Sequence, residues 1–182
     1  ACNRVIDASR YVNMAVPNIS LQNPSASPLF LREAEIRRGV ELLYFGYSHL
    51  TRAIDEELAT QGLGRAHHRA LYFIARQPDL TVSDLLRLLA ITKQSLGRVL
   101  NDLAERGLIE NRPGTLDRRQ KLLRLTEAGA VLEARLFASL RQKMARAYGN
   151  AGQSAVTGFW QVLEGLIPES AIGRVIALQR ER

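Results

Sequence analysis

The sequence predicts a mainly α-helical fold with one small β-hairpin, and three observations lead to this prediction. Apolar residues recur at spacings of three and four over most of the chain, which is the period of an amphipathic helix. Threonine precedes three of these stretches, where its hydroxyl can cap a helix N-terminus. Between Leu108 and Leu125 the pattern changes to short runs around a Pro-Gly pair, which is typical of two strands joined by a turn.

Length and composition limit the class of protein. The chain has 182 residues, enough for one large domain or a domain with extensions. Its net charge of +7 favours a polyanionic partner or an anionic surface. No apolar run approaches the ~18 residues of a membrane span, and the start lacks the apolar core of a signal peptide. The single cysteine, Cys2, excludes a disulfide framework and a thiolate zinc site, so we expect a cytoplasmic protein without a cofactor.

The N-terminal part divides into an arm and a long helix. Three prolines with several Asn and Ser argue against a long helix in residues 1–28. A helix is predicted from about Leu29 to Ala59, with an apolar seam formed by Ile36, Val40, Leu43, Tyr47, Leu50, Ile54 and Leu58. Gly62 and Gly64 end this helix, and we interpret Gly62-x-Gly64 as a helix break and not as a phosphate-binding loop.

Three shorter helices follow. The first covers roughly Arg65 to Arg76, with Leu71 and Ile74 directed inward. Thr81, followed three residues later by Asp84, is a capping-box-like start for the second, whose stripe is Leu85, Leu88 and Leu89. The third begins at the N-cap Thr92 and ends near Arg106, before Gly107 in a left-handed conformation. Its apolar face is Leu96, Val99, Leu100 and Leu103.

The polar face of this third helix has two interpretations. Lys93, Gln94 and Ser95 lie in its first turn, where free N–H groups and the positive end of the dipole favour phosphate. Such a helix start, second in a pair of short helices, suits reading of a major groove. The alternative is the solvated face of an ordinary core helix.

A basic hairpin after this helix favours the first interpretation, contact with nucleic acid. Leu108-Ile109 leads into a first strand, Pro113 and Gly114 suit the two central positions of a type II turn, and Leu123 and Leu125 mark a second strand. Five basic and two acidic residues lie between Glu110 and Arg124. A basic ribbon directly after a helix-turn-helix is a winged helix, whose tip can insert arginine into a minor groove.

The C-terminal part predicts three more helices. Thr126 is an N-cap candidate for a helix that runs to about Tyr148 and is closed by Gly149-Asn150. A second helix follows, and Ile167-Pro168 separates it from the last. Their apolar faces have no remaining domain to cover, so we expect them to meet the long first helix and a second copy of themselves in a two-fold dimer.

The segment from about residue 65 to 126 resembles the winged-helix core of the MarR (multiple antibiotic resistance regulator) family of bacterial transcription factors. The resemblance rests on ITKQSLGRVLNDLAERGLI as recognition helix, on Asp117-Arg118-Arg119 as the D-x-R signature of the wing, and on Leu123-x-Leu125-Thr126 before the next helix. It implies a winged helix-turn-helix domain over 61–126, flanked by a helical dimerisation region over 29–60 and 127–182, with 1–28 as an arm.

The resemblance also implies residue roles. The base-contacting positions of the recognition helix fall on Thr92, Gln94, Ser95 and Arg98, and the minor-groove arginine falls on Arg119. We expect phosphate contacts from Lys93, Arg112, Arg118 and Lys121, and we expect Asp117 to pair with a neighbouring arginine and fix its direction. Gly97 departs from the family, which often has a small polar residue there. It can allow close approach to DNA or to a neighbouring helix.

Other candidate sites each have a plainer reading. In the family a small-molecule pocket lies between the dimerisation helices and the winged helix, so Tyr44, Tyr47 and Tyr72 can line it, or they can be core aromatics. His67 and His68, adjacent on one helix, point about 100° apart and make a poor metal-chelating pair even with His49, so no metal is expected. Cys2 in the arm is either a peroxide-sensing thiol or incidental.

The predicted function is a homodimeric, sequence-specific regulator that binds a palindromic double-stranded operator, with a small-molecule effector as a further partner that the sequence leaves open. The alternative is a winged helix that binds an acidic protein partner through its basic ribbon. An enzyme ranks third, because no nucleophile–base pair, paired catalytic carboxylates or phosphate-cradling loop is visible.

Overall fold

The computed structural model describes residues 28–114 and 120–180. The chain divides into two compact units, residues 1–42 and 43–182. The described part of the first unit holds a short 3₁₀ helix, Pro28–Leu31, and the first turns of helix α1. All other described residues belong to the second unit.

Helix α1, Glu33–Thr60, confirms the predicted long helix, but its apolar seam is not buried throughout. Only Thr51, Ile54 and Leu58 of this helix are buried. Leu50 is half-buried, whereas the large apolar side chains from Ile36 to Tyr47 are exposed, with Tyr44 and Phe45 at 71% and 66%. The seam therefore packs within the subunit only over its last turns.

Helices α2 (Arg65–Arg76), α3 (Val82–Leu89) and α4 (Lys93–Glu105) form the body predicted from the periodicity. The Thr81 hydroxyl accepts a hydrogen bond from the Asp84 N–H, and the Thr92 hydroxyl accepts one from the Ser95 N–H, each at 3.1 Å. These caps satisfy backbone donors that have no partner inside their helices. Gly107 follows α4 with a φ of +67°, as predicted for a left-handed helix end.

The sheet has three strands and not two. Strands β2 (Ile109–Pro113) and β3 (Lys121–Leu125) form the predicted hairpin, and the two-residue strand β1 (Leu80–Thr81) pairs with the other side of β3. The order is β1-β3-β2, antiparallel throughout, with Leu80 opposite Leu123 and Ile109 opposite Leu125. Strand β1 was not predicted, because two residues are too few to show an alternating pattern.

The predicted turn at Pro113-Gly114 is wrong. Pro113 is the last residue of β2 and pairs with Lys121, and the Gly114 N–H donates to the Gln120 carbonyl at 2.9 Å. The hairpin ladder thus includes both residues of the Pro-Gly pair, and residues 115–119 lie outside the described residues. Proline is tolerated here because it ends a strand at the sheet edge, where no ladder donor is required.

Helix α5, Glu127–Ala151, begins where predicted, with the Thr126 hydroxyl accepting a hydrogen bond from the Gly129 N–H at 3.1 Å. It continues through Gly149 and Asn150, which were expected to close it, and ends at Gly152 with a φ of +82°. Helices α6 (Gln153–Gly165) and α7 (Glu169–Arg180) follow. None of these helices, nor any other in the described residues, is long and apolar enough to cross a membrane.

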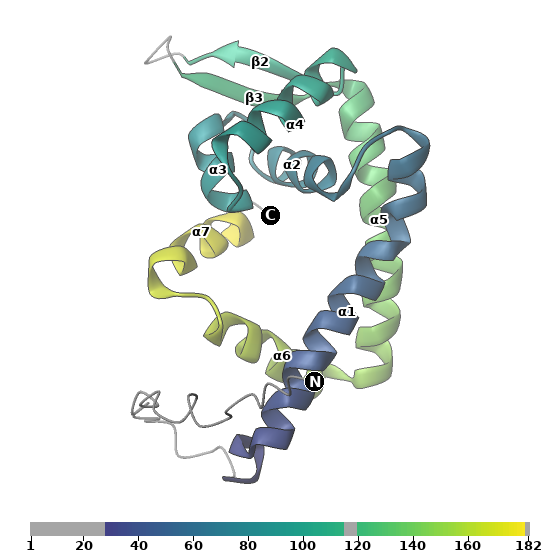
Figure 1. The fold of residues 1–182 in the computed structure, drawn as a ribbon, viewed down its shortest axis with the longest axis vertical. Helices are drawn as coiled ribbons and strands as arrows, with labels where there is room; N and C mark the ends of the chain where they lie inside the picture. The colour runs from purple at the N-terminus through teal and green to yellow at the C-terminus, as the bar shows by residue number, and fades with distance from the viewer. Residues whose placement is uncertain (1–27, 115–119, 181–182) are drawn as a thin grey trace, which may run out of the picture. The chain divides into compact units, whose positions relative to one another are not determined.

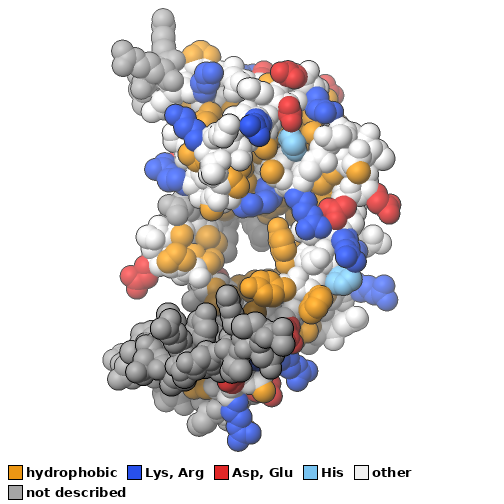
Figure 2. Space-filling view, in the orientation of Figure 1, with side chains coloured by type: hydrophobic (Ala, Val, Ile, Leu, Met, Phe, Trp, Pro, Cys, Tyr) orange, Lys and Arg blue, Asp and Glu red, His pale blue; other side chains and the backbone are white. Residues whose placement is uncertain are grey.

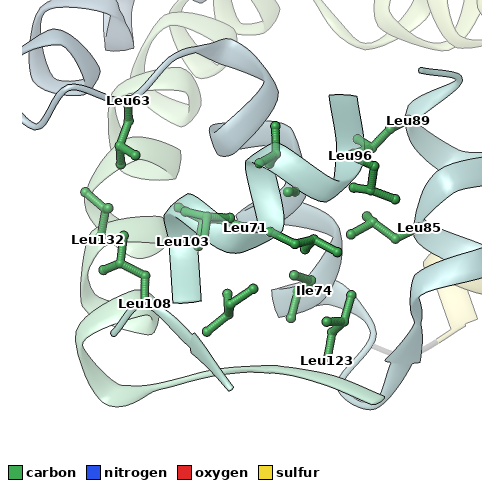
Figure 3. Close-up of a cluster of buried hydrophobic side chains, with 14 of the residues drawn as sticks. Leu63, Leu71, Ile74, Leu85, Leu89, Leu96, Leu103, Leu108, Leu123 and Leu132 are labelled. Atoms are coloured by element: carbon green, nitrogen blue, oxygen red, sulfur yellow. The ribbon is translucent and has the colours of Figure 1, made fainter. Parts of the chain in front are cut away.

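One hydrophobic core joins α2, α3, α4, the sheet and the N-terminal half of α5 (Figure 1). Leucine dominates it, and Leu71, Leu85, Leu103, Leu123 and Leu136 are fully buried. Figure 3 shows side chains of α2, α3 and α4 meeting those of β3 and α5. Helix α4 and the base of the β2–β3 hairpin therefore share this core. In contrast, no residue of α6, which the structure describes completely, is buried.

Candidate nucleic-acid interface

The residues of α4 that are predicted to contact DNA, four at base edges and Lys93 at phosphate, lie at its N-terminal end. Thr92, Lys93, Gln94, Ser95 and Arg98 are all exposed. Besides capping the helix, the Thr92 hydroxyl donates to the Ser95 hydroxyl at 2.9 Å. The cap thereby orients two of the five side chains, while the amide and the two cations extend from the surface. Free N–H groups and the positive helix dipole at this end also attract phosphate.

Gly97 lies on the same exposed part of α4. A β-carbon at this position would meet nothing within 4 Å among the described residues. The glycine is therefore not needed for packing against a neighbouring helix of the described subunit. Of the two reasons that the sequence left open, packing against a neighbouring helix is thus excluded within the described residues.

The hairpin stem carries fewer free cations than the sequence suggested. Arg112 forms an ion pair with Glu110 at 2.6 Å, and Arg124 forms one with Asp79 at 2.5 Å. Lys121 is exposed and forms no ion pair with any residue that the structure describes. Asp117, Arg118 and Arg119 lie outside the described residues, so their predicted roles stay predictions.

Cations gather on the surface that α3, α4 and the hairpin share. Figure 2 shows Lys and Arg side chains distributed over this end of the second unit. Arg87 of α3 is exposed on this surface and forms an ion pair with Asp84. It was not predicted from the sequence. A basic residue three positions after the capping Asp84 could have suggested it.

A second set of contacts, also missed from the sequence, holds the C-terminal half of α4. His67 Nδ1 accepts a hydrogen bond from the Gly64 N–H at 3.0 Å, and His67 Nε2 lies 3.2 Å from the Asp102 carboxylate. Because Nδ1 acts as acceptor, the neutral ring carries its proton on Nε2 and donates it to Asp102. Arg106 Nη1 donates to the Gln61 carbonyl at 2.5 Å. These partners are 35 and 45 residues apart, and no local pattern indicates them.

The predicted pocket aromatics are not brought together. Tyr72 contacts the rings of His68, Phe73 and Phe137, with its centroid 6.1 Å from that of Phe137 on α5. Tyr44 and Tyr47 are exposed on α1, and within the described residues no ring contact joins either of them to Tyr72. Tyr72 is therefore part of an aromatic contact between α2 and α5, whereas the other two tyrosines lie on an open surface.

Two titratable groups lie on the α2 and α5 side of the molecule. His68 is only 8% exposed and its Nε2 has no hydrogen-bond partner. Burial lowers the pKa of His68, and the nearby Arg69 charge lowers it further. Burial raises the pKa of Glu133, against the opposing effect of Arg76. Within the described part of the chain, no three His, Cys, Asp or Glu side chains gather in a way that could hold a metal ion.

Comparison with known proteins places this geometry in a family. A model described as MarR family matches residues 61–120, which cover α2 to the wing. The chain is 48% identical over 139 residues to the HTH-type transcriptional regulator PetP of Rhodobacter capsulatus. That match covers 76% of this chain and 84% of PetP.

Solved structures show the same fold. A MarR-family transcriptional regulator from Silicibacter pomeroyi aligns with a TM-score of 0.62 and 19% identity, over 78% of this chain and 94% of that one. A cysteine-to-serine mutant of MarR from E. coli, complexed with operator DNA, aligns with a TM-score of 0.59 and 24% identity, over 78% of this chain and all of that one. At these identities the likeness concerns the fold.

Proposed function

Since this chain belongs to the MarR family of transcriptional regulators, we propose that it binds a palindromic double-stranded operator as a homodimer. One observation carries the proposal: helix α4, whose N-terminus is exposed, polar and basic, shares one hydrophobic core with the base of the β2–β3 hairpin. A helix that enters a major groove and a ribbon that follows the adjacent minor groove require such a fixed relationship.

The proposed contacts fall into three groups. Thr92, Gln94, Ser95 and Arg98 read base edges in the major groove, where an arginine can bind guanine through two hydrogen bonds. Arg119, oriented with the help of Asp117, enters the minor groove. Lys93, Arg112, Arg118 and Lys121 contact phosphates, and these contacts position the protein without reading sequence. Arg112 must divide its guanidinium between Glu110 and DNA, so we expect it to contribute less than Lys121.

The proposed dimer uses exposed apolar side chains on two helices, α6 and the part of α1 before its buried last turns. On α1 it comprises Leu43, Tyr44, Phe45 and Tyr47. On α6 and its C-cap it comprises Phe159, Trp160, Val162 and Leu166, and each of these side chains is at least 41% exposed. Apolar side chains gathered in this number are unusual on a monomer and typical of an interface. A symmetric dimer would bury them and place two recognition helices about one DNA turn apart.

We further propose that a small-molecule effector modulates DNA binding by changing the spacing of the two recognition helices. The supporting observation is the partly buried cluster of Tyr72, His68 and Phe137 between α2 and α5, with one unpaired buried nitrogen on His68. Tyr44 and Tyr47 would join such a site only if the partner subunit closed over them.

The deciding experiment is selection of bound sequences from a pool of random DNA duplexes. We expect enrichment of a palindrome with half-sites about ten base pairs apart, because a two-fold dimer presents its recognition helices at that spacing. A selection that yields no enriched sequence, together with no binding of random duplex at low salt, would contradict the proposal. That outcome would favour a winged helix that binds an acidic protein.

A further inference from the structure

Four charged side chains form a network across the stem of the hairpin. The Asp79 carboxylate accepts two hydrogen bonds from Arg124, at 2.7 Å from Nε and 2.5 Å from Nη2. Arg124 lies directly opposite Glu110 in the sheet, and Glu110 is paired with Arg112 at 2.6 Å. Opposite residues in an antiparallel pair share a face, as do residues two apart along a strand. The network therefore runs from the helical body across β3 to β2, with no net charge.

Asp79 is the point at which this network is attached to the helical body. It follows α2 and immediately precedes β1, and its backbone is left-handed with a φ of +66°. Its N–H donates to the Leu123 carbonyl at 3.0 Å. Asp79 thus holds β3 at two successive residues, through its backbone at Leu123 and through its side chain at Arg124.

The base of the hairpin is held in the core through the buried Ile109 and Leu123, but the outer part of the stem has few contacts that could fix its direction. Strand β1 pairs with β3 only at Leu80 and Thr81, opposite Leu123 and Leu122. In the outer half of the stem, Asn111, Arg112, Pro113 and Lys121 are exposed. The angle at which the hairpin leaves the body is therefore set at its base, by the buried Ile109 and Leu123 together with the ion pair of Asp79 and Arg124.

We propose that Asp79 is a positioning residue for the wing: its two-bond ion pair with Arg124 fixes the direction of the hairpin, so that the tip meets DNA together with α4. The inference rests on the proposed function, because it assumes that the tip contacts DNA. Asp79 acts through Arg124 and β3 and needs no contact with DNA itself.

One substitution is expected to change DNA affinity in opposite directions under the two explanations, positioning of the wing and simple electrostatics. Asp79→Asn removes a negative charge, and electrostatics alone predicts tighter binding to a polyanion. Asparagine also tolerates the left-handed backbone, so the change adds no backbone strain. If Asp79 positions the wing, the variant binds a duplex selected from the random pool about five- to tenfold more weakly than the wild type. This loss is smaller than the largest loss expected when a base-contacting arginine is removed. Binding to random duplex at low salt stays unchanged or becomes slightly tighter.

Asp55 provides a matched control. It accepts the same pair of hydrogen bonds from Arg65, at 2.9 and 2.7 Å. Exposures are 43% for Arg65 and 38% for Asp55, against 41% for Arg124 and 38% for Asp79. The Asp55–Arg65 pair joins α1 to α2 and lies outside the proposed DNA contacts. Asp55→Asn is therefore expected to bind the selected duplex as the wild type does, or slightly more tightly.

A second variant leaves the charge unchanged. Arg124→Lys keeps one positive charge but cannot form the two parallel hydrogen bonds of a guanidinium. It is expected to reproduce the loss seen with Asp79→Asn, and neither change should add to the effect of Arg119→Ala when the two are combined. Thermal unfolding establishes whether each variant is folded. If Asp79→Asn does not fold, the DNA affinity of Arg124→Lys tests the positioning role by itself.

Two failures are distinguishable. If the wild type selects no duplex, the proposed function and this inference both fall. If the wild type binds its selected duplex, while Asp79→Asn and Arg124→Lys bind equally well or more tightly, the proposed function stands and the positioning role of Asp79 is wrong.

Discussion

Gly129 is the residue at which one added methyl group is expected to cost most stability. A β-carbon at this position would lie 1.9 Å from the Leu108 carbonyl oxygen, which already accepts a hydrogen bond from the Thr126 N–H. Gly129→Ala must therefore push α5 away from the start of β2. We expect a loss of about 2 kcal/mol or more in the free energy of unfolding, measured by urea denaturation at fixed protein concentration.

Gly149→Ala is the control on the same helix. A β-carbon there meets nothing within 4 Å among the described residues, and the position is exposed. Alanine is a better helix former than glycine by up to about 1 kcal/mol, so this variant should be as stable as the wild type or more so. Equal effects of the two substitutions would contradict the close approach of α5 to Leu108.

His68 makes stability depend on pH. Burial lowers its pKa in the folded state, whereas the unfolded chain takes up the proton near the ordinary value of about 6.5. As the pH falls from 7.5 to 5.5, the unfolded state binds more protons than the folded one, so the free energy of unfolding decreases, by at most about 1.4 kcal/mol per pH unit. Urea denaturation of wild type and His68→Leu at both pH values measures this difference.

Comparison with His68→Leu is needed because Glu133 acts in the opposite direction. Its raised pKa means that the folded state takes up this proton first, so its contribution to stability grows as the pH falls. Both proteins contain Glu133, and the difference between them isolates the histidine. An identical pH dependence of the two proteins would show that His68 does not carry the effect.

Arg119→Ala tests the tip of the wing. Removing an arginine from a minor groove should weaken binding of the selected duplex by about 1–3 kcal/mol, without lowering the thermal unfolding temperature. Arg141→Ala, which removes the same charge from the exposed side of α5, is the control. Unchanged affinity of Arg119→Ala at moderate salt in a DNA-binding titration would count against the role of the wing.

At the scale of the elements, the hairpin stem and its tip are expected to differ in what they give to binding. Arg112 and Arg124 are paired with Glu110 and Asp79, so the stem contributes direction more than charge. Lys121 is the cation of the described stem that has no such partner among the described residues. Within the described stem, Lys121 is therefore the cation that we expect to be available to phosphate.

Lys121→Ala should lower affinity for all duplexes by a similar factor, because a phosphate contact carries no sequence information. It should also reduce the slope of log affinity against log salt by about one, measured by titration at several salt concentrations. Lys143→Ala, an exposed lysine on α5, is expected to leave the slope unchanged. A specific loss for Lys121→Ala on the selected duplex alone would indicate base contact instead.

At the scale of the whole molecule, the exposed apolar surface predicts self-association. Phe45 is 66% exposed on α1, and we expect Phe45→Glu to convert a dimer into a monomer, measured by analytical ultracentrifugation. Because the two half-sites are then bound independently, affinity for the palindrome should fall by at least about a hundredfold. Val131→Glu on α5, where the wild-type side chain is 56% exposed, should leave the dimer intact. A wild-type protein that sediments as a monomer at micromolar concentration would contradict the dimer.

The sequence by itself determined the starts of α3, α4 and α5 and the extent of α2, whereas α1 begins at Glu33 and not at Leu29 as predicted. Thr81, Thr92 and Thr126 cap the helices that they were predicted to cap, and α2 spans the predicted residues, because caps and apolar stripes depend on neighbours within a few positions. The predicted wing and family also followed from a contiguous segment, and the family match over residues 61–120 confirms that assignment.

Only the tertiary structure decided which surfaces and charges remain free. Strand β1, the extension of the ladder past Pro113, and the exposure of the first half of the α1 seam depend on elements that meet in space. The pairing of Asp79 with Arg124 joins residues 45 positions apart. Arg124 is one of the five cations counted in the ribbon, and nothing in its local sequence distinguishes it from the others. A charge in a sequence has a sign, but only its neighbours in the folded chain determine whether it is available to a partner.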